Sequence, residues 1–158
     1  MDLTFSMKDG VFNYRACAVI VRDGRLLAMK DKRSPYYYLP GGRVQLHETA
    51  EKAVLREVRE ELQIKATIVR PLWMVQNFFT EDVTGERFHE LCMYFLVDAS
   101  GTALPVMENH FTGAEVAKGQ EFYWLTFEQV EREYLYPLFL KKHIRSLPEQ
   151  LALLTEIE

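Results

Sequence analysis

The spacing of apolar residues divides the chain into strand-like and helix-like stretches. Two apolar runs within residues 14–32 meet at Asp23-Gly24, a dipeptide that favours a two-residue hairpin turn. Two longer runs, 65–80 and 86–100, are rich in β-branched and aromatic residues and flank the turn-like EDVTG, so they predict a second, longer hairpin. The sequences YYYL, before Pro40 and two glycines, and FYWLT each predict a short strand.

The helical pattern is clearest between Thr49 and Leu62, with Thr49 as the predicted N-cap. Thr126 precedes a second helical stretch, FEQVEREY, which is expected to continue or re-form beyond Pro137 through LFLKKHIRS. The tail LPEQLALLTEIE is compatible with a helix or an extended segment. Strands on both sides of a helix, then a strand and a terminal helix, predict an α/β fold in one domain over residues 1–158, with a mixed sheet between helices.

Composition narrows the class of protein. The chain has 158 residues, of which 48% are apolar and 27% charged, as in globular domains. A net charge of -4 argues against a large nucleic-acid surface, because such surfaces depend on cationic side chains. We find no membrane-spanning run and no secretory signal, so we expect a cytoplasmic protein. Cys17 and Cys92 lie in apolar runs and are expected to be buried free thiols.

Three glutamates crowd one side of the predicted central helix. When its residues are placed at 100° intervals, the apolar stripe contains Ala50, Val54, Val58 and Leu62. Glu61 falls almost on this stripe, with Glu57 and Glu60 beside it. Half-buried carboxylates repel one another unless a cation neutralises them, and oxygen ligands without a Cys or His cluster suit Mg²⁺ or Mn²⁺. The three glutamates therefore predict a divalent-metal site.

The stretch from Gly42 to Ile64 resembles the Nudix box. That motif consists of Gly, five residues, Glu, seven residues, Arg-Glu, an aliphatic residue, any residue, Glu-Glu, any residue, Gly and an aliphatic residue. The matching positions here are Gly42, Glu48, Arg56, Glu57, Val58, Glu60, Glu61 and Ile64. Gln63 replaces the second glycine, which affects the turn that ends the helix and removes no ligand. The flanking LPGG and YWLT are similar to the family's layout as well.

The resemblance implies an α/β/α sandwich and Mg²⁺-dependent hydrolysis of a nucleoside diphosphate linked to another group. Nucleoside triphosphates and nucleotide sugars both fit as small nucleotide substrates. Glu57, Glu60 and Glu61 are the expected metal ligands, joined by a backbone carbonyl of Gly41 or Gly42, because a loop without side chains allows the main chain to approach an ion. The resemblance further implies that Arg56 and Glu48 form a pair that braces the loop against the helix.

Other candidates lie outside the motif. The segment from Gly101 to Glu121 lacks a period and predicts a long surface loop that could supply the base for the attacking water. Glu121 is the first candidate for a further metal ligand or base, followed by Glu108 and Glu115, and Glu57 is the alternative if none of them serves. The predicted substrate contacts are Arg43, which is otherwise a solvated loop residue, Glu90, and an aromatic such as Phe79 for base stacking.

Two other functions use the same fold. A non-catalytic regulatory module would be expected to lack some of the box glutamates, all of which are present here. A prenyl diphosphate isomerase would need a reactive cysteine and a glutamate in its pocket, whereas Cys17 and Cys92 are both expected to be buried. The oligomeric state stays open, with a homodimer as one form.

Overall fold

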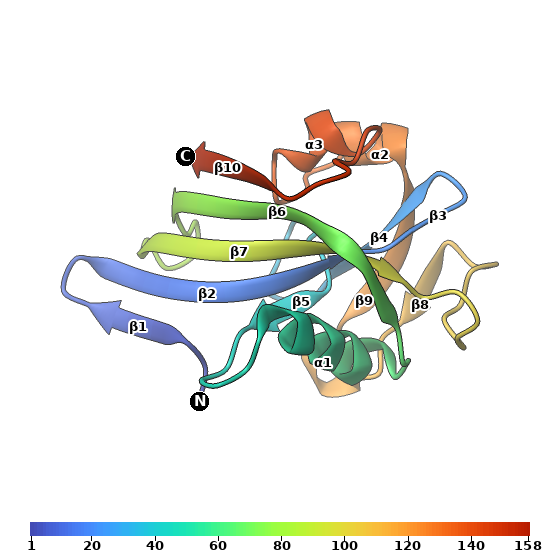
Figure 1. Ribbon diagram of the computed structural model, residues 1–158, viewed down its shortest axis with the longest axis horizontal. Coiled ribbons are helices and arrows are strands. Elements are labelled where there is room, and N and C mark those ends of the chain that lie inside the picture. Colours follow the sequence, from blue (N-terminus) through green and yellow to red (C-terminus); the bar gives the residue numbers. More distant parts are fainter.

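The computed structural model describes residues 1–158 and contains two β-sheets with helices on both sides (Figure 1). The larger sheet is six-stranded and has the order β1-β2-β7-β6-β10, with β5 paired to β2. The pairs β2·β7 and β6·β10 are parallel and the others are antiparallel, so the sheet is mixed. Its strands are β1 (Thr4–Met7), β2 (Gly10–Val19), β5 (Gly41–Arg43), β6 (Thr67–Thr80), β7 (Arg87–Asp98) and β10 (Ala152–Ile157).

The smaller sheet is four-stranded and has the order β3-β4-β9-β8. Its strands are β3 (Val21–Arg22), β4 (Arg25–Lys30), β8 (His110–Thr112) and β9 (Glu121–Thr126). The helices are α1 (Ala50–Leu62), α2 (Phe127–Arg132) and α3 (Leu140–His143), and a 3₁₀ turn covers Val116–Lys118.

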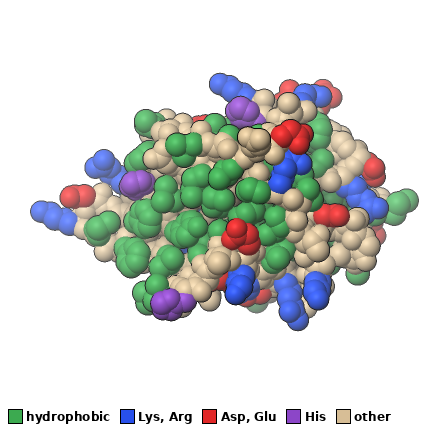
Figure 2. Space-filling model, in the orientation of Figure 1, with side chains coloured by type: hydrophobic (Ala, Val, Ile, Leu, Met, Phe, Trp, Pro, Cys, Tyr) green, Lys and Arg blue, Asp and Glu red, His purple; other side chains and the backbone are tan.

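Two apolar cores separate these layers. One core joins α1, through Val54 and Val58, to Phe122 and Trp124 of β9. The other joins Leu125 of β9 to residues of α2 and α3. Because side chains alternate along a strand, the two faces of β9 meet different helices. The mixed α/β arrangement with helices on both sides confirms the predicted fold class. On the face shown in Figure 2, apolar side chains gather over the part of the larger sheet that α1 leaves uncovered.

The ends of α1 follow from its sequence. The Thr49 hydroxyl accepts a hydrogen bond from the Lys52 amide at 3.2 Å, which satisfies one free N–H of the first turn. At the other end Gln63 has φ 56° and its N–H donates to the Arg59 carbonyl. A side chain in this left-handed conformation costs about 1 kcal/mol relative to glycine. The helix thus ends in the turn that the motif expects, although Gln63 replaces glycine.

Both predicted hairpins are confirmed. Val21 pairs with Leu26 and Arg22 with Arg25 around Asp23-Gly24, and β6 pairs with β7 over almost their full lengths. The tail is extended, since β10 runs parallel to β6. The helical stretch expected beyond Pro137 re-forms only as the four-residue helix α3.

Two sequence-based predictions of local structure were wrong. Tyr37 and Tyr38 form only isolated bridges, and the strand begins at Gly41 instead, where a Cβ would lie 2.4 Å from the Ala16 carbonyl oxygen. Glycine is needed there because the backbone approaches β2 so closely. The segment from residue 101 to 121 is not a continuous loop, because it contains β8 and a 3₁₀ turn.

Candidate active site

The Glu57 carboxylate lies directly over the glycine turn at the start of β5. A Cβ placed on Gly42 would lie 2.3 Å from Glu57 Oε1, so glycine leaves the space that this carboxylate occupies. Burial raises the pKa of Glu57, and the neighbouring Arg56 opposes that rise. The helix and the glycine turn therefore bring a carboxylate and a bare backbone into contact.

Arg56 connects the loop, the helix and the strand. Its Nε donates to Glu48 Oε1 at 2.7 Å and its Nη2 to Glu48 Oε2 at 3.0 Å, a two-pronged arrangement that a planar guanidinium favours. Its Nη1 donates to Glu57 Oε1 at 2.8 Å, and Nη2 also reaches the Arg43 carbonyl at 3.1 Å. The Glu48 carboxylate also accepts a hydrogen bond from the Gln45 backbone amide. The expected brace between Arg56 and Glu48 is thus present, and it also fixes Glu57.

Glu61 is a buried carboxylate with incomplete hydrogen bonding. The residue is 4% exposed, and its Oε2 is buried without a partner. Burial raises its pKa well above the usual value, as do the charges of Glu57 and Glu115, whereas the Gly41 amide opposes the rise. An orphaned buried carboxylate oxygen normally costs stability, so its presence beside Glu57 is typical of a site that binds a cation.

Glu60 differs from the expected placement. Its side chain is 51% exposed and lies 3.5 Å from Arg56 Nη1, on the outer side of the helix. The expectation that all three glutamates avoid open water was therefore wrong for Glu60, because helical angles give the direction of Cβ and not the path of a long side chain. No three Asp, Glu, His or Cys side chains converge closely enough to hold an ion.

The donor set nevertheless fits a hard divalent cation. Glu57 supplies a half-buried carboxylate and Glu61 a buried one, whose Oε2 has no hydrogen-bond partner in the protein. Glu60 is the nearest exposed carboxylate that rotation could add, and the Gly42 backbone lies beside Glu57. These are oxygen ligands of the type that Mg²⁺ and Mn²⁺ prefer.

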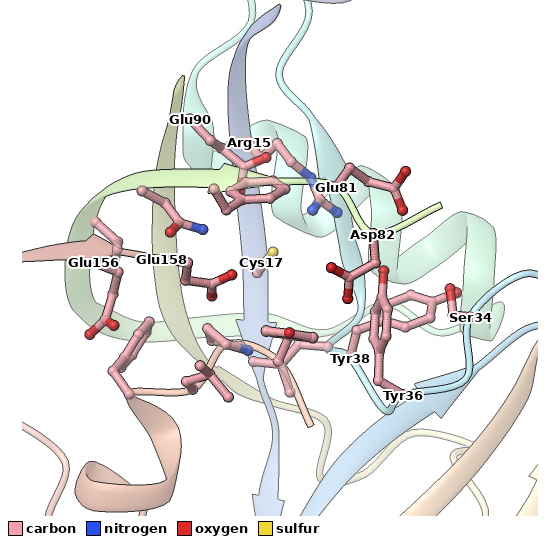
Figure 3. Close-up of a pocket in the computed structure, with 18 of the residues that line it drawn as sticks. Arg15, Cys17, Ser34, Tyr36, Tyr38, Glu81, Asp82, Glu90, Glu156 and Glu158 are labelled. Atoms are coloured by element: carbon pink, nitrogen blue, oxygen red, sulfur yellow. The ribbon is translucent and has the colours of Figure 1, made fainter. Parts of the chain in front are cut away.

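A pocket of about 330 Å³ opens on the face of the larger sheet opposite α1 (Figure 3). Arg15 of β2 lines it, and this arginine lies close enough to Glu57 to lower the pKa of that carboxyl. Glu90 and Phe79 also line the pocket, as expected of substrate contacts. Arg43 is exposed and stands in register with Arg15 across β2 and β5. Arg15 thus lines the pocket and also lies near the carboxylate of Glu57.

The structure does not bring Glu121 to the box glutamates. Glu121 and Leu125 are four positions apart on β9, so their side chains project from the same face of the strand. That is the face opposite α1. Its carboxylate accepts from His110 Nε2 at 2.6 Å and lies 3.3 Å from the Thr112 hydroxyl. The sequence placed Glu121 at the end of a loop, which does not tell on which face of the sheet its side chain lies. That face depends on how β9 pairs with its neighbours.

Glu115 is better placed than Glu121. The loop that carries it is tied to α1, because the Ala114 amide donates to the Glu61 carbonyl at 3.1 Å. Glu115 pairs with Lys118, and the charges of Glu57 and Glu61 help to raise the pKa of that lysine, after the hydrogen bond to Glu115. Glu108 makes none of these contacts.

Sequence reasoning missed two basic residues near the glutamates, Arg15 and Lys118. One signal was available for Arg15, since a charge interrupts the apolar run YRACAVIV where a buried strand is predicted. Lys118 carries no comparable signal, because a lysine in a polar loop is ordinary.

Comparison with known proteins supports the reading of the motif. The family model of the NUDIX domain matches residues 12–147. An ADP-ribose pyrophosphatase of Methanocaldococcus jannaschii is 29% identical over 89 residues, 54% of this chain and 50% of that protein. A MutT-like protein of Streptomyces ambofaciens is 43% identical over 53 residues, 34% of each chain. The alignments thus span half or less of these curated relatives.

Solved structures agree on the fold. The MutT protein of Bacillus halodurans superimposes with a TM-score of 0.64 at 16% identity, covering 91% of this chain and 89% of the other. The MutT protein of Methanosarcina mazei gives 0.59 at 20% identity, covering 89% and 95%. No helix is long and apolar enough to cross a membrane. With the motif, the fold and a domain match over most of its length, the chain belongs to the Nudix family.

Proposed function

We propose that the protein is a Mg²⁺-dependent pyrophosphohydrolase that cleaves a nucleoside diphosphate linked to another group. The observation that carries this proposal is the buried, unpartnered Glu61 oxygen beside Glu57, above a glycine turn and close to Arg15. A half-buried carboxylate pair next to a pocket with an arginine fits the cleavage of a charged phosphoanhydride bond.

Glu57, Glu60 and Glu61, with the Gly42 carbonyl, would hold the ion, which when bound neutralises phosphate charge and lowers the pKa of a water molecule. Arg56 fixes Glu57 through its 2.8 Å hydrogen bond and keeps the carboxylate aimed at the glycine turn. Arg15 is placed to bind a phosphate oxygen between the pocket and the helix.

In the proposed reaction a water oxygen forms a bond to phosphorus, and the bond from phosphorus to the bridging oxygen breaks. Glu115 accepts the proton of the attacking water, because its carboxylate lies near Glu61 without belonging to the helix that holds the ion. Lys118 forms an ion pair with that carboxylate and also feels the charges of Glu57 and Glu61. Glu57 is the alternative base.

The substrate is a nucleoside triphosphate or a nucleotide sugar. One relative is named an ADP-ribose pyrophosphatase, which supports the nucleotide-sugar class, and the motif itself fits both classes. A net charge of -4 supports a small nucleotide rather than RNA as the substrate.

One observation favours a second candidate, a prenyl diphosphate isomerase. Cys17 lines the pocket together with Glu90, and a hydrogen bond from the Cys92 thiol, with Sγ atoms 3.5 Å apart, lowers the pKa of Cys17. Cys17 is a buried free thiol, as expected, and at 4% exposed its sulfur still faces the pocket (Figure 3). Isopentenyl diphosphate therefore belongs in the test.

The test is a substrate panel with EDTA-treated protein, with and without added Mg²⁺. Nucleoside triphosphates, nucleotide sugars, a short RNA and isopentenyl diphosphate are assayed for phosphate release, pyrophosphate release or isomerisation. We expect Mg²⁺-dependent hydrolysis of at least one small nucleotide, loss of that activity in Glu57→Gln, and normal activity in Glu51→Gln, an exposed glutamate on the same helix. Full turnover in EDTA, or turnover only of isopentenyl diphosphate, contradicts the proposal.

A further inference from the structure

Four polar side chains form a row across the floor of the larger sheet. Asn13 of β2 is in register with Glu90 of β7, Glu90 with Asn77 of β6, and Asn77 with Glu156 of β10. Side chains in register on neighbouring strands project from the same face, and three of these four line the pocket. We call Asn13, Glu90, Asn77 and Glu156 the acceptor row.

The acceptor row has oxygens without donors. The Oδ1 atoms of Asn13 and Asn77 are buried and have no hydrogen-bond partner. Glu90 is 6% exposed, and its carboxylate takes part in none of the side-chain hydrogen bonds or salt bridges of the molecule, although its charge helps to raise the pKa of Arg15 in the same pocket. A buried acceptor that stays unpaired costs stability, so such a row is normally satisfied by a ligand or by water.

More carboxylates surround the pocket mouth. Asp82 and Glu158 lie on opposite sides of the pocket and both point toward its centre (Figure 3). Neither forms a salt bridge, and after burial the charges of Glu156 and Asp82 raise the pKa of Glu158. The aromatic wall beside them includes Tyr36 and Tyr136, whose ring centroids are 4.9 Å apart. Aromatic rings and carboxylates together are the surroundings that cationic groups prefer.

The charge of the pocket does not suit an anionic ligand group. Arg15 is the only basic residue in its lining, against six acidic residues, Asp31, Glu81, Asp82, Glu90, Glu156 and Glu158. Asp31 and Glu81 are occupied by local hydrogen bonds, to Tyr38 and to the backbone of the 81–86 turn respectively. Asp82 accepts a long hydrogen bond, 3.4 Å, from the Tyr134 hydroxyl, and the side chains of Glu90, Glu156 and Glu158 accept none, so these four remain for a ligand. A phosphate is expected only at Arg15, and the rest of the pocket repels one.

We infer that the pocket selects the part of a nucleotide substrate that presents N–H donors or positive charge to the acceptor row, with Glu90 as the specificity-determining residue. The inference rests on the proposed hydrolase function and refines it. Two sources can supply this chemistry: an amine on the group beyond the diphosphate, or the donor edge of a base. A substrate that presents only carbonyl or hydroxyl acceptors leaves Glu90 unpaired and is disfavoured.

Two matched pairs distinguish the sources. CDP-ethanolamine and CDP-glycerol share a nucleotide and differ in the charge of the linked group, whereas GTP and ITP differ only in the 2-amino group of the base. We expect kcat/KM to be at least about tenfold higher for the donor-bearing member of one pair, the ratio that one lost hydrogen bond to a charged group produces. The pair that shows the ratio identifies which part of the substrate enters the pocket.

Substitutions then connect the preference to named residues. Glu90→Gln keeps the side-chain shape but replaces one acceptor oxygen with a donor, and Asp82→Asn does the same at the rim. We expect Glu90→Gln to reduce the preference to about threefold or less, through a fall in kcat/KM for the donor-bearing member. Glu149 lies outside the pocket and its side chain is 89% exposed. Glu149→Gln is therefore the control, and it should retain the wild-type ratio of kcat/KM values.

Equilibrium binding separates this inference from the hydrolase proposal. Calorimetric titration of the same four nucleotides into EDTA-treated protein measures the preference without turnover. Absence of hydrolysis with a preserved binding preference contradicts the proposed reaction and supports the pocket inference. The inference is overturned if, in both pairs, the two members have kcat/KM values and affinities equal within twofold. It is also overturned if the preference survives both Glu90→Gln and Asp82→Asn, or if none of the four nucleotides binds measurably.

Discussion

The carboxylate of Glu57 occupies the space that any side chain at Gly42 would need, with Oε1 2.3 Å from the position of a Cβ. The two residues are fifteen positions apart in the sequence, on a helix and on a strand of the larger sheet. Their contact explains why the motif requires glycine at one end and glutamate at the other. The position of the Glu57 carboxylate in the proposed metal site therefore depends on the bare main chain at Gly42.

Gly42→Ala is expected to displace Glu57 while the fold survives. The added methyl group meets only the end of a flexible side chain, which can rotate away. A displacement of about 1 Å at a reacting group costs about 100-fold in rate, so we expect kcat/KM to fall by that order with little change in melting temperature. Wild-type kcat/KM in this variant would show that Glu57 tolerates displacement and does not act where we place it.

Arg56→Lys is expected to lose stability and activity together. Lysine keeps the charge but cannot make the two-pronged contact to Glu48 and the contact to Glu57 at once. We expect a loss of about 1–2 kcal/mol in urea unfolding, reduced by the partial exposure of the pair, and a fall in kcat/KM. Arg59→Lys on the exposed side of the same helix is the control. Equal effects of the two substitutions would argue against the bracing role.

Local features of this protein were predictable from its sequence. The apolar spacing of α1, the hydroxyl of Thr49 and the Asp23-Gly24 turn act over a few residues, so each was read correctly. The motif also places Glu57 and Glu61 on one helix before any tertiary contact is known. These features depend on backbone preferences and short-range hydrogen bonds, which a single sequence records directly.

Features that depend on long-range pairing were not predictable. Arg15 reaches the pocket because β2 pairs in parallel with β7, more than 70 residues away. Glu121 points away from α1 because of the face that β9 presents to that helix. Likewise, the register that aligns Asn13, Glu90 and Asn77 involves three strands, and nothing in the local sequence of any one of them specifies it.

Glu61→Gln is expected to stabilise the metal-free protein at neutral pH. The folded-state pKa of Glu61 is raised, so the folded protein binds a proton more tightly than the unfolded chain does. In EDTA the stability of the wild type should therefore fall as pH rises from the ordinary glutamate pKa, about 4.3, toward the raised value. Gln carries no charge, so the variant should lose this part of the slope and have a higher urea midpoint at pH 7.

The measurement is urea unfolding from pH 4.5 to 8 in EDTA, with Glu51→Gln as the exposed control. Added Mg²⁺ should stabilise the wild type and have a smaller effect on Glu61→Gln, because the variant lacks an anionic ligand. Wild-type and variant curves with the same pH slope would show that Glu61 is not the buried, uncompensated carboxylate that the structure describes.

The source of the base can be decided by comparing Glu115→Gln with Glu121→Gln. Glu115 lies on a loop tied to α1, and its charge acts on Glu61, whereas Glu121 is bound to His110 on the opposite face of β9. Loss of a general base typically costs 100-fold or more in kcat, so we expect a fall of at least about 100-fold in Glu115→Gln with little change in KM. Glu121→Gln should keep kcat within about twofold and lose at most about 1 kcal/mol of stability, the contribution of an exposed pair.

If Glu121→Gln loses kcat and Glu115→Gln does not, substrate must reach the other face of the smaller sheet, and the assignment reverses. If both variants keep their kcat, the proton passes to Glu57, and Glu57→Gln should then lower kcat at saturating Mg²⁺.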